Sequence, residues 1–375
     1  MVSTAIVLFF VFLFAFAVEL FFYLGIYGRL VFYKPPAPFL VKLPVSVIIC
    51  AKNEAENLLE NLPEIFNQEH DDFEVVVVND CSVDETEDVL RAFADKHHNL
   101  KIVTVKENEH FSGGKKFALT LGIKAAKYDV LLLTDADCKP KSDRWIKQMT
   151  APFADETTEI VLGYSGFQQQ KGSLNKLIRF DAFLIAIQYL SHALIGFPYM
   201  GVGRNLAYRK SLFFKNKGFA SHQRISSGDD DLFINEVAKK NNIVIQMIPE
   251  SQTVSKAKST FSEWFWQKRR HFTTGSRYKF VDLLLLALPQ IAKYLFILTF
   301  IILIILRFNI YLIFVPVILR IFAQMLIFRG SLKQLGESGL LFLAVLLAFL
   351  LTLIYPILAV SNLIAKPKRW TKNLN

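Results

Sequence analysis

The stretch Asp-Val-Leu-Leu-Leu-Thr-Asp-Ala-Asp, residues 129–137, decides the fold because it joins an apolar run to a pair of acids. A short apolar run bounded by polar residues is typical of a strand that is buried on both faces of a sheet. Asp135 and Asp137 follow where this predicted strand ends. Two carboxylates one residue apart can bind a hard divalent cation such as Mg²⁺ or Mn²⁺, so we expect a ligand site here.

The sequence around this strand alternates between strand and helix patterns. Strands are predicted at residues 45–50, 73–79 and 102–105, and helices at 55–66, 82–96 and 116–127. Alternating units of this kind predict an α/β, Rossmann-like, mostly parallel sheet with helices on both faces. In such sheets, ligands bind beyond the carboxyl ends of the strands.

Polar residues follow three of the four predicted strands. They are Lys52, Asn53 and Glu54 after the first strand, Asp80 and Asp84 after the second, and Asp135 and Asp137 after the fourth. Turn formation alone explains a single polar residue at a strand end. Acids at three strand ends of one sheet indicate a functional site.

Two further segments contain residue types that are common in phosphate and proton chemistry. Gly113-Gly114-Lys115-Lys116 opens a predicted helix, where glycine backbone, helix N-terminus and lysine attract phosphate, although such a turn is often an ordinary loop. Asp229-Asp230-Asp231 begins another helix. These acids either interact favourably with the helix dipole or raise one another's pKa, and a raised pKa suits a general base.

The apolar residues, 53% of the chain, concentrate before residue 28 and after residue 280. Apolar runs at 4–27, 283–306, 310–328 and 340–364 approach or exceed the roughly 20 residues that cross a bilayer. The first run has no basic segment before it, so we expect an anchor and not a cleaved signal peptide. Arg320 lies inside the third run and should face protein, water or the membrane interface.

We therefore divide the chain into five parts. They are a transmembrane helix (1–28), a proline-containing linker (29–43), a cytoplasmic domain (44–279), a membrane region of about three helices (280–365) and a basic tail (366–375). Basic residues beside the apolar runs mark the cytoplasmic side of what we expect to be a multi-pass plasma-membrane protein. Three C-terminal spans would place Lys366, Lys368 and Arg369 outside, so one run is interfacial or re-entrant.

Charge and cysteine content exclude some classes of protein. The net charge is +10, yet no basic stripe with interleaved aromatics crosses the middle domain, so no nucleic-acid partner is expected. The three cysteines, Cys50, Cys81 and Cys138, have no pair at metal-ligand spacing, which argues against a disulfide framework or a zinc site.

The order of these motifs resembles the inverting glycosyltransferases of family 2, whose membrane-bound members include polysaccharide synthases and ceramide glucosyltransferase. The resemblance covers roughly residues 45–275. It rests on Ala51-Lys-Asn-Glu54, Asn79-Asp80-Cys-Ser-Val-Asp84, Gly114-Lys115 with Ala118-Leu119, Asp135-Ala-Asp137 and Gly228-Asp229-Asp230. It implies a GT-A fold and a nucleotide diphosphate sugar, UDP- or GDP-linked, as donor.

The resemblance also implies roles for individual residues. Ala51, Glu54 and Asp80 would hold the nucleoside, Lys115 the base or diphosphate, Asp135 the donor ribose or sugar, and Asp137 a Mn²⁺ or Mg²⁺ ion. The family's acidic pair falls on Asp229 and Asp230, and the second acid of that pair is the general base, which implies Asp230. Because Asp231 is a third adjacent acid, the alignment of the pair with this triplet stays open.

The segment Trp264–His271 has two readings that can coexist. It is typical of an interfacial belt of aromatic and basic residues, and it also resembles the family's Q-x-x-R-W element on the acceptor or diphosphate side. Gln267 and Arg270 match that element, whereas His271 replaces its tryptophan. This departure leaves the type of acceptor open.

The predicted reaction moves a sugar to a hydroxyl of a lipid or glycan acceptor. A processive polysaccharide synthase is the alternative within the family, although three C-terminal runs are few for a channel. A catalytically inactive membrane scaffold is the alternative from another class, and intact acids at the expected positions count against it. A sugar-phosphate nucleotidyltransferase would want a Gly- and Arg-rich loop after the first strand, where Ala51-Lys-Asn-Glu54 stands.

Overall fold

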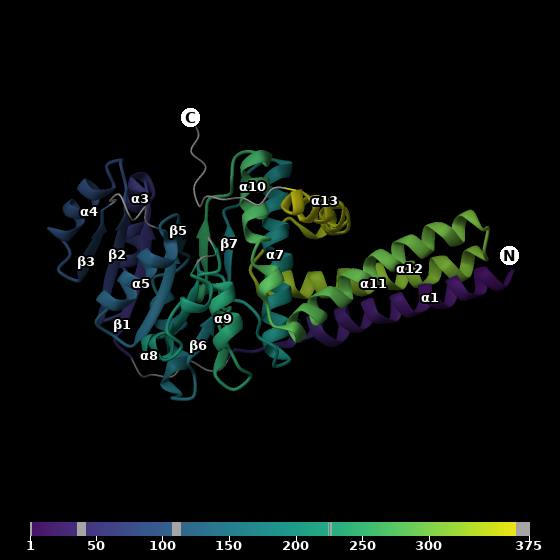
Figure 1. The fold of residues 1–375 in the computed structure, drawn as a ribbon, viewed down its shortest axis with the longest axis horizontal. Coiled ribbons are helices and arrows are strands. Elements are labelled where there is room, and N and C mark those ends of the chain that lie inside the picture. Colours follow the sequence, from purple (N-terminus) through teal and green to yellow (C-terminus); the bar gives the residue numbers. More distant parts are fainter. Residues whose placement is uncertain (1, 36–42, 107–113, 224, 226, 365–375) are drawn as a thin grey trace.

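The structure is a computed structural model that describes residues 2–35, 43–106, 114–223, 225 and 227–364. A sheet domain forms one end of the molecule, and a long bundle of three helices extends from it to the other end (Figure 1). The basic tail and residues 36–42 of the predicted linker lie outside the described residues. The α/β fold class with a mostly parallel sheet, as the alternation of strands and helices predicts, is confirmed.

A seven-stranded sheet is the centre of the described domain, in the order β3-β2-β1-β4-β8-β6-β9. Its strands are β1 (Val45–Ala51), β2 (Phe73–Asp80), β3 (Leu100–Val105), β4 (Val130–Asp135), β6 (Ile160–Leu162), β8 (Leu206–Arg209) and β9 (Ile243–Ile245). The first four strands are parallel, and β8 runs antiparallel to both of its neighbours. The carboxyl ends of β1, β2 and β4 therefore meet at one edge, where the acids lie.

Helices cover both faces of this sheet, which explains why its strands are apolar along their whole length. One face packs against α3 (Ala55–Phe66), α4 (Thr86–Ala94) and α6 (Trp145–Thr150). The other face packs against α5 (Lys115–Ala125), α7 (Ser173–Leu194) and α9 (Asp231–Val237). Alternate β1 residues enter the two cores, Val47 on the first face and Ile48 on the second.

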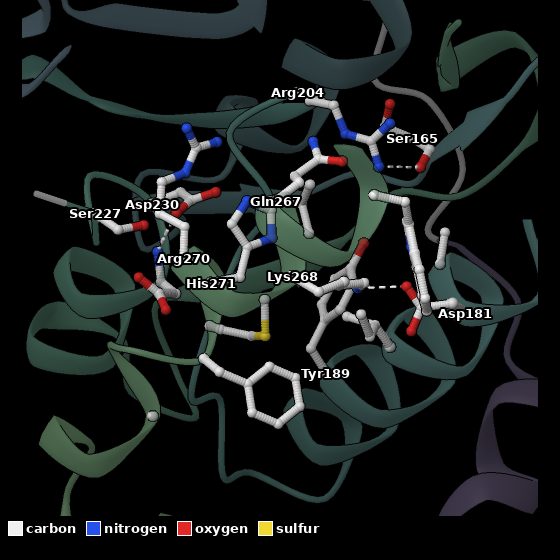
Figure 2. Close-up of a pocket in the computed structure, with 18 of the residues that line it drawn as sticks. Ser165, Asp181, Tyr189, Arg204, Ser227, Asp230, Gln267, Lys268, Arg270 and His271 are labelled. Carbon is white, nitrogen blue, oxygen red and sulfur yellow. Dashed lines mark hydrogen bonds and ion pairs between the residues drawn. The ribbon is translucent and has the colours of Figure 1, made fainter. Parts of the chain in front are cut away.

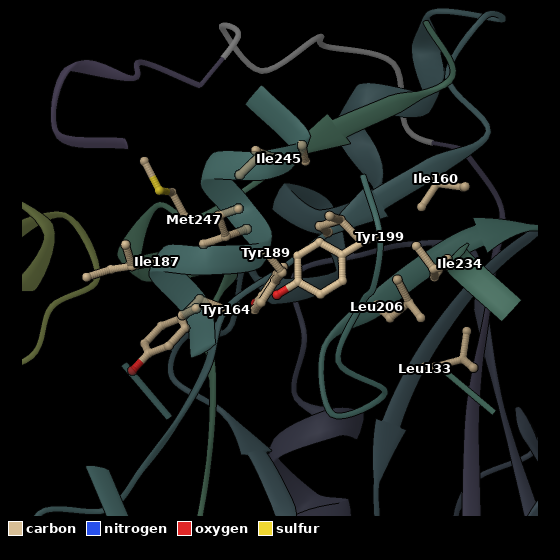
Figure 3. Packing of buried hydrophobic residues seen from close by; sticks show 14 of the residues in the cluster. Leu133, Ile160, Tyr164, Ile187, Tyr189, Tyr199, Leu206, Ile234, Ile245 and Met247 are labelled. Atoms are coloured by element: carbon tan, nitrogen blue, oxygen red, sulfur yellow. The ribbon is translucent and has the colours of Figure 1, made fainter. Parts of the chain in front are cut away.

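Helix α7 joins the sheet to the helical bundle. Figure 3 shows its Tyr189 beside Tyr199, in the hydrophobic cluster that also contains Leu206 and Ile245 of the sheet. The same hydrophobic core continues into the base of the helical bundle. The sheet domain and the bundle are therefore one packed unit.

The long bundle contains the N-terminal helix and two C-terminal helices (Figure 1). Its members are α1 (Val2–Phe21), continued by the π-helix η1 (Phe22–Tyr27) and α2 (Gly28–Phe32), then α11 (Phe280–Ile305) and α12 (Ile310–Gln334). Phe12 and Phe296 stack between them with ring centroids 4.6 Å apart. The N-terminal helix thus runs four residues beyond the expected end at residue 28, and a tight turn joins α11 to α12 as expected.

The last apolar run lies beside the sheet domain and also contacts α11 and α12 of the bundle. Residues Leu341–Leu343 form a 3-10 turn, and α13 (Ala344–Ile364) then packs against α7 and α10 (Phe261–His271). Figure 1 shows α13 next to α7 and α10, away from the tip of the bundle. Five helices of the described chain are long and apolar enough to cross a membrane: α1–α2, α7, α11, α12 and α13.

Smaller elements complete the domain. They are the sheet β5-β10-β7 (Cys138–Pro140, Thr253–Ser255 and Ser165–Phe167), helix α8 (Lys210–Lys215), and short 3-10 turns at Ala151–Ala154, Ala220–His222, Pro249–Ser251 and Gly275–Arg277. We expected a helix over 82–96, but α4 begins at Thr86. Ser82 instead accepts a hydrogen bond from the Asn53 amide at 3.0 Å, so its hydroxyl stabilises the loop after β1.

Candidate active site

A cavity of about 1390 Å³ lies at the carboxyl edge of the sheet. It is bounded by this edge, by α10 and by the bases of α7, α11 and α13. The predicted site residues that line it are Glu54, Lys115, Asp135, Asp137, Asp229, Asp230, Gln267, Arg270 and His271. Ala51 and Asp80 are the two predicted site residues outside this lining. The structure thus gathers residues that are up to 217 positions apart in the sequence, Glu54 and His271.

Lys115 is the electrostatic centre of the acidic cluster. Its Nζ lies 2.9 Å from Asp135 Oδ1 and 3.0 Å from Asp229 Oδ2. Burial opposes the charge of Lys115, but the two carboxylates raise its pKa well above the ordinary value. Burial also opposes ionisation of Asp229, yet the nearby ammonium lowers the pKa of that carboxyl. One cation therefore holds together acids from β4 and from the start of α9.

Asp230 lies deep in the site and is held by two backbone amides. Its Oδ2 accepts from Gly203 N and its Oδ1 from Asp231 N, both at 2.8 Å. Burial, Asp229 and Asp231 raise the pKa of Asp230 to about 7. Gly228 makes the preceding turn with φ +97°, where a Cβ would meet Leu232 at 2.5 Å. Asp230 can thus exchange a proton near neutral pH.

Asp231 has a different environment, which bears on the register of the acidic triplet. Its Oδ1 accepts from Leu232 N at 2.7 Å, and its Oδ2 accepts from Tyr278 Oη at 2.8 Å and from the Thr274 hydroxyl. These donors come from α9 and from the connection between α10 and α11. Asp231 thereby ties the start of α9 to the connection before α11, although it lines the cavity as Asp230 does (Figure 2 shows Asp230).

Asp135 and Asp137 are the carboxylates available for a divalent cation. Burial and Asp135 raise the pKa of Asp137, a repulsion that a cation would relieve. The described residues contain no group of three or more His, Cys, Asp or Glu side chains arranged for a metal ion. Mg²⁺ and Mn²⁺ suit a sparser site, because such ions often bind through one or two carboxylates together with substrate phosphates. The residues present fit that kind of site.

The residues that we predicted to hold the donor nucleoside lie at the ends of β1 and β2. Glu54 receives a hydrogen bond from Asn57 Nδ2 at 2.6 Å, and burial raises its pKa. Asp80 is buried, and its Oδ2 accepts from Gly114 N at 3.1 Å, which fixes the chain just before α5. Asp80 Oδ1 has no hydrogen-bond partner among the described residues. Ala51 is fully buried at the end of β1.

Helix α10 presents Gln267, Arg270 and His271 to the cavity from one side (Figure 2). A capping box fixes its start, in which Thr260 Oγ1 accepts from Glu263 N at 3.3 Å and the Glu263 carboxylate accepts from Thr260 N at 3.2 Å. Burial lowers the pKa of His271 well below the ordinary value, and Arg270 and Lys268 add to this shift. His271 is therefore neutral at pH 7.

Arg204 is a cavity residue that the sequence-based set of site residues lacks. Its guanidinium donates to Ser165 O at 3.1 Å and to Ser255 Oγ at 2.8 Å, and it stacks over Phe167 with its centre 4.3 Å from the ring centroid. The positive charge of Arg204 also lowers the pKa of Asp137, against the larger effect of burial. Its place in the glycine-containing segment Gly201-Val-Gly-Arg-Asn205 is the sequence feature that could have identified it.

A buried ion pair, also absent from the predicted set, lines the cavity where α7, α10 and α13 meet. Lys268 of α10 pairs with Asp181 of α7 (Figure 2), and Tyr355 of α13 donates to Asp181 Oδ1 at 2.6 Å. All three residues line the cavity. No local sequence pattern links them, because they come from three separate helices.

The sheet topology and the acids at its edge define a GT-A-like domain. Residues 46–215 match the profile of glycosyl transferase family 2, and residues 151–364 match that of glycosyl transferase family group 2. The second match covers more than half of the chain, so the chain belongs to this family. The resemblance seen in the sequence motifs is thereby confirmed.

Curated relatives and solved structures share parts of this arrangement. "Probable glycosyltransferase YdaM" of Bacillus subtilis is 26% identical over 244 residues, which is 62% of this chain and 55% of the relative. A poly-beta-1,6-N-acetyl-D-glucosamine synthase of Staphylococcus epidermidis is 32% identical over 93 residues, 25% of this chain and 21% of the synthase. The chain spans about half the length of the first curated relatives that it matches.

One solved structure matches both the domain and the helices. The mannosyltransferase PcManGT of Pyrobaculum calidifontis, solved with GDP-Man and Mn²⁺, aligns over 90% of this chain and 98% of its own with a TM-score of 0.58. Its sequence identity to this chain is 18%, so the likeness shows the fold alone.

Proposed function

We propose that the protein is a membrane-bound inverting glycosyltransferase that moves a sugar from a nucleotide diphosphate sugar to a hydroxyl of a lipid or glycan acceptor. The observation that supports this most is the convergence of Asp135, Asp137, Asp229 and Asp230 on one large cavity beyond the strand ends. Family membership supports the reaction class, and the mannosyltransferase PcManGT, which shares the fold, was solved with GDP-Man.

The proposed reaction is a single displacement. The oxygen of the acceptor hydroxyl forms a bond to the anomeric carbon from the face opposite the diphosphate. At the same time Asp230 takes the proton of that hydroxyl. The bond from the anomeric carbon to the diphosphate oxygen breaks, and its electron pair leaves with the nucleoside diphosphate. Lys115 and Arg270 supply positive charge for the departing diphosphate.

Donor binding divides among the remaining residues of the site. Ala51, Glu54 and Asp80 hold the nucleoside at the ends of β1 and β2, and Asp135 faces the donor ribose or sugar. Asp137, with Asp135 nearby, would hold Mn²⁺ or Mg²⁺, which when bound neutralises charge on the diphosphate. Asp229 positions Lys115 beside the donor. Gln267 and His271 face the acceptor side of the cavity.

The bundle gives the proposed protein a simple membrane topology. If α1–α2, α11 and α12 cross the membrane, the sheet domain, α13 and the basic tail all lie on one side. This arrangement satisfies the preference of Lys366, Lys368 and Arg369 for the cytoplasmic side. In it, α13 is the interfacial run that the sequence requires, and the catalytic domain is cytoplasmic at the plasma membrane.

A panel of UDP- and GDP-sugars tests the proposed activity. The purified chain, supplied with Mn²⁺ and a membrane lipid extract, should release nucleoside diphosphate from one donor and form a product with inverted anomeric configuration. Mass spectrometry identifies the product, and NMR gives its configuration. A product that retains the donor configuration would contradict a single displacement, and a lack of release from every donor would favour the inactive scaffold.

A further inference from the structure

A second cavity, of about 400 Å³, lies inside the membrane helices next to the active site. Its lining comes from α1 and η1, α7, α11, α12 and α13, and it includes Glu19, Lys293 and Arg320. Gln188, Gln290 and Tyr355 line both this cavity and the active-site cavity. The two cavities therefore meet at a shared wall.

The positive charges in the lining of this cavity outnumber the negative ones. Arg320 Nε donates to Glu19 Oε2 at 2.7 Å, and its Nη1 donates to Gln324 Oε1 at 2.9 Å. Lys293 Nζ donates to Gln290 Oε1 at 2.9 Å, and among the described residues no carboxylate lies within 4 Å of it. One carboxylate thus faces two cations. A net positive charge between membrane helices is costly unless an anion completes it.

Local geometry also indicates a binding site and not only a structural ion pair. Glu19 is 2% exposed, and it is held by Arg320. The helix widens directly afterwards into the π-helix Phe22–Tyr27, which places Tyr23 and Tyr27 on the cavity wall. Single π-helical turns of this kind occur frequently at functional sites. An ion pair that served only to lock α1 to α12 would need neither Lys293 nor the open volume.

We propose that this cavity binds the phosphate of a lipid-linked acceptor through Lys293 and Arg320. The inference rests on the proposed function and names the class of its acceptor. Ile297 and Ile301 of α11 and Val345 and Phe349 of α13 are apolar residues in the lining of this second cavity. Between these two helices an apolar chain can leave toward the bilayer, while the polar end of the acceptor passes Gln290 and Tyr355 toward Asp230.

Helix α11 sets the separation between the phosphate and the reacting hydroxyl. Its Asp282 accepts from Asn235 of α9 at 2.8 Å, one helical turn along α9 from Asp231. From Asp282 to Lys293 the helix rises roughly 16 Å at 1.5 Å per residue. A spacer of this order must join the two groups in one molecule. The acceptor is therefore a glycan attached through phosphate to a lipid, and not a bare lipid phosphate.

Binding of two probes of equal chain length tests the phosphate site. The full chain in lipid nanodiscs is titrated with farnesyl phosphate and with farnesol, and bound ligand is measured by native mass spectrometry. We expect at least a tenfold preference for farnesyl phosphate, which Lys293→Gln removes and Lys293→Arg keeps. Lys333→Gln, which neutralises an exposed lysine on the same bundle, should leave the preference unchanged.

Three results would overturn the inference. They are equal binding of the two probes to the wild type, an unchanged preference in Lys293→Gln, and an equal loss in Lys333→Gln. Inorganic phosphate at the same concentration should not displace farnesyl phosphate, and displacement would mean that the site takes free phosphate and not a lipid. Melting temperatures check that each variant is folded.

Donor binding separates this inference from the proposed function. Lys293→Gln should bind the nucleotide sugar as the wild type does, because Lys293 lies outside the active-site lining. A chain that prefers farnesyl phosphate but binds no donor would contradict the proposed function alone. A chain that binds and hydrolyses donor but shows no phosphate preference would contradict the lipid-phosphate inference alone.

Discussion

Two buried clusters of charge lie on either side of one wall, and they differ in sign and in origin. The cluster at the strand ends is acidic, with Asp135, Asp229 and Asp230 around Lys115. The cluster between the membrane helices has a surplus of positive charge, with Lys293 and Arg320 facing Glu19. The first suits a cation and a sugar donor, and the second suits an anion. A protein that joins a nucleotide sugar to a phosphate-bearing lipid would need both.

Among changes to the acidic cluster, removal of the predicted cation site should reduce the rate of sugar transfer most. Asp137→Ala should reduce sugar transfer about 10³-fold, because a cation on the diphosphate supplies several kcal/mol of charge stabilisation. Chelation with EDTA should abolish transfer in the wild type, and added Mn²⁺ should restore it. Initial rates of nucleoside diphosphate release measure both effects.

Asp143→Asn provides the control for this variant, because Asp143 is an exposed acid outside the cavity. It should keep the wild-type rate. Full activity of Asp137→Ala, or activity that persists in EDTA, would contradict the assignment of Asp137.

Breaking the buried Lys268–Asp181 pair of the active-site cavity should have the next largest effect, a loss of stability. Lys268→Met leaves Asp181, which is 2% exposed, without its cation. Breaking a buried ion pair from one side costs about 3–5 kcal/mol, so a clear fall in melting temperature is expected. Thermal unfolding in nanodiscs measures it.

The matched control for the buried Lys268–Asp181 pair is the exposed pair of Lys256 with Glu60. Lys256→Met should change the free energy of unfolding by only about 0–1 kcal/mol, because water screens an exposed pair. Equal melting temperatures for the two lysine variants would mean that the Lys268–Asp181 pair does not stabilise the fold.

The pH dependence of transfer should follow Asp230, whose pKa is raised to about 7. Below this value the carboxyl is protonated and cannot accept the acceptor's proton, so the rate should fall about tenfold per pH unit and level off above neutrality. A pH–rate profile measures this. A rate that is flat from pH 5 to pH 8 would contradict the role of Asp230 as the base.

Asp230 should also affect the pH dependence of stability. Its effect has the opposite sign to that of a carboxylate in an ordinary ion pair, whose pKa is lowered by folding. Because folding raises the pKa of Asp230, the folded state keeps a proton that the unfolded chain has already released. The contribution of Asp230 to stability should therefore decrease as the pH rises from about 4 to about 7. Melting curves of Asp230→Asn should lack this part of the pH dependence.

The two clusters also differ in how far the sequence could predict them. Asp135, Asp137 and Asp230 lie in short motifs at strand ends and helix starts, where local pattern and fold class together predict their position. Glu19, Lys293 and Arg320 come from three helices and share no spacing. Arg320 could be predicted to need a partner because it lies in an apolar run, but only the packing of α1 against α12 identifies Glu19.

Helix boundaries and α7 show the same limit. Apolar runs predict the bundle helices to within a few residues, since a span must be apolar along its length. The sequence did not predict α7, because its residues face a core on most sides and lack a clean periodic stripe. Likewise α13 reads as a span by composition, whereas tertiary contacts through Tyr355 and Asn362 place it against α7 and α10.

The most direct test of the proposed reaction is the transfer rate of Asp230→Asn, measured together with its affinity for the donor. Asparagine has nearly the same shape but cannot take up the hydroxyl proton. We predict a loss of transfer of about 10²–10⁴-fold, the usual contribution of a general base, with donor affinity close to that of the wild type. Transfer at the wild-type rate by a folded Asp230→Asn variant would contradict the assignment of Asp230 as the base.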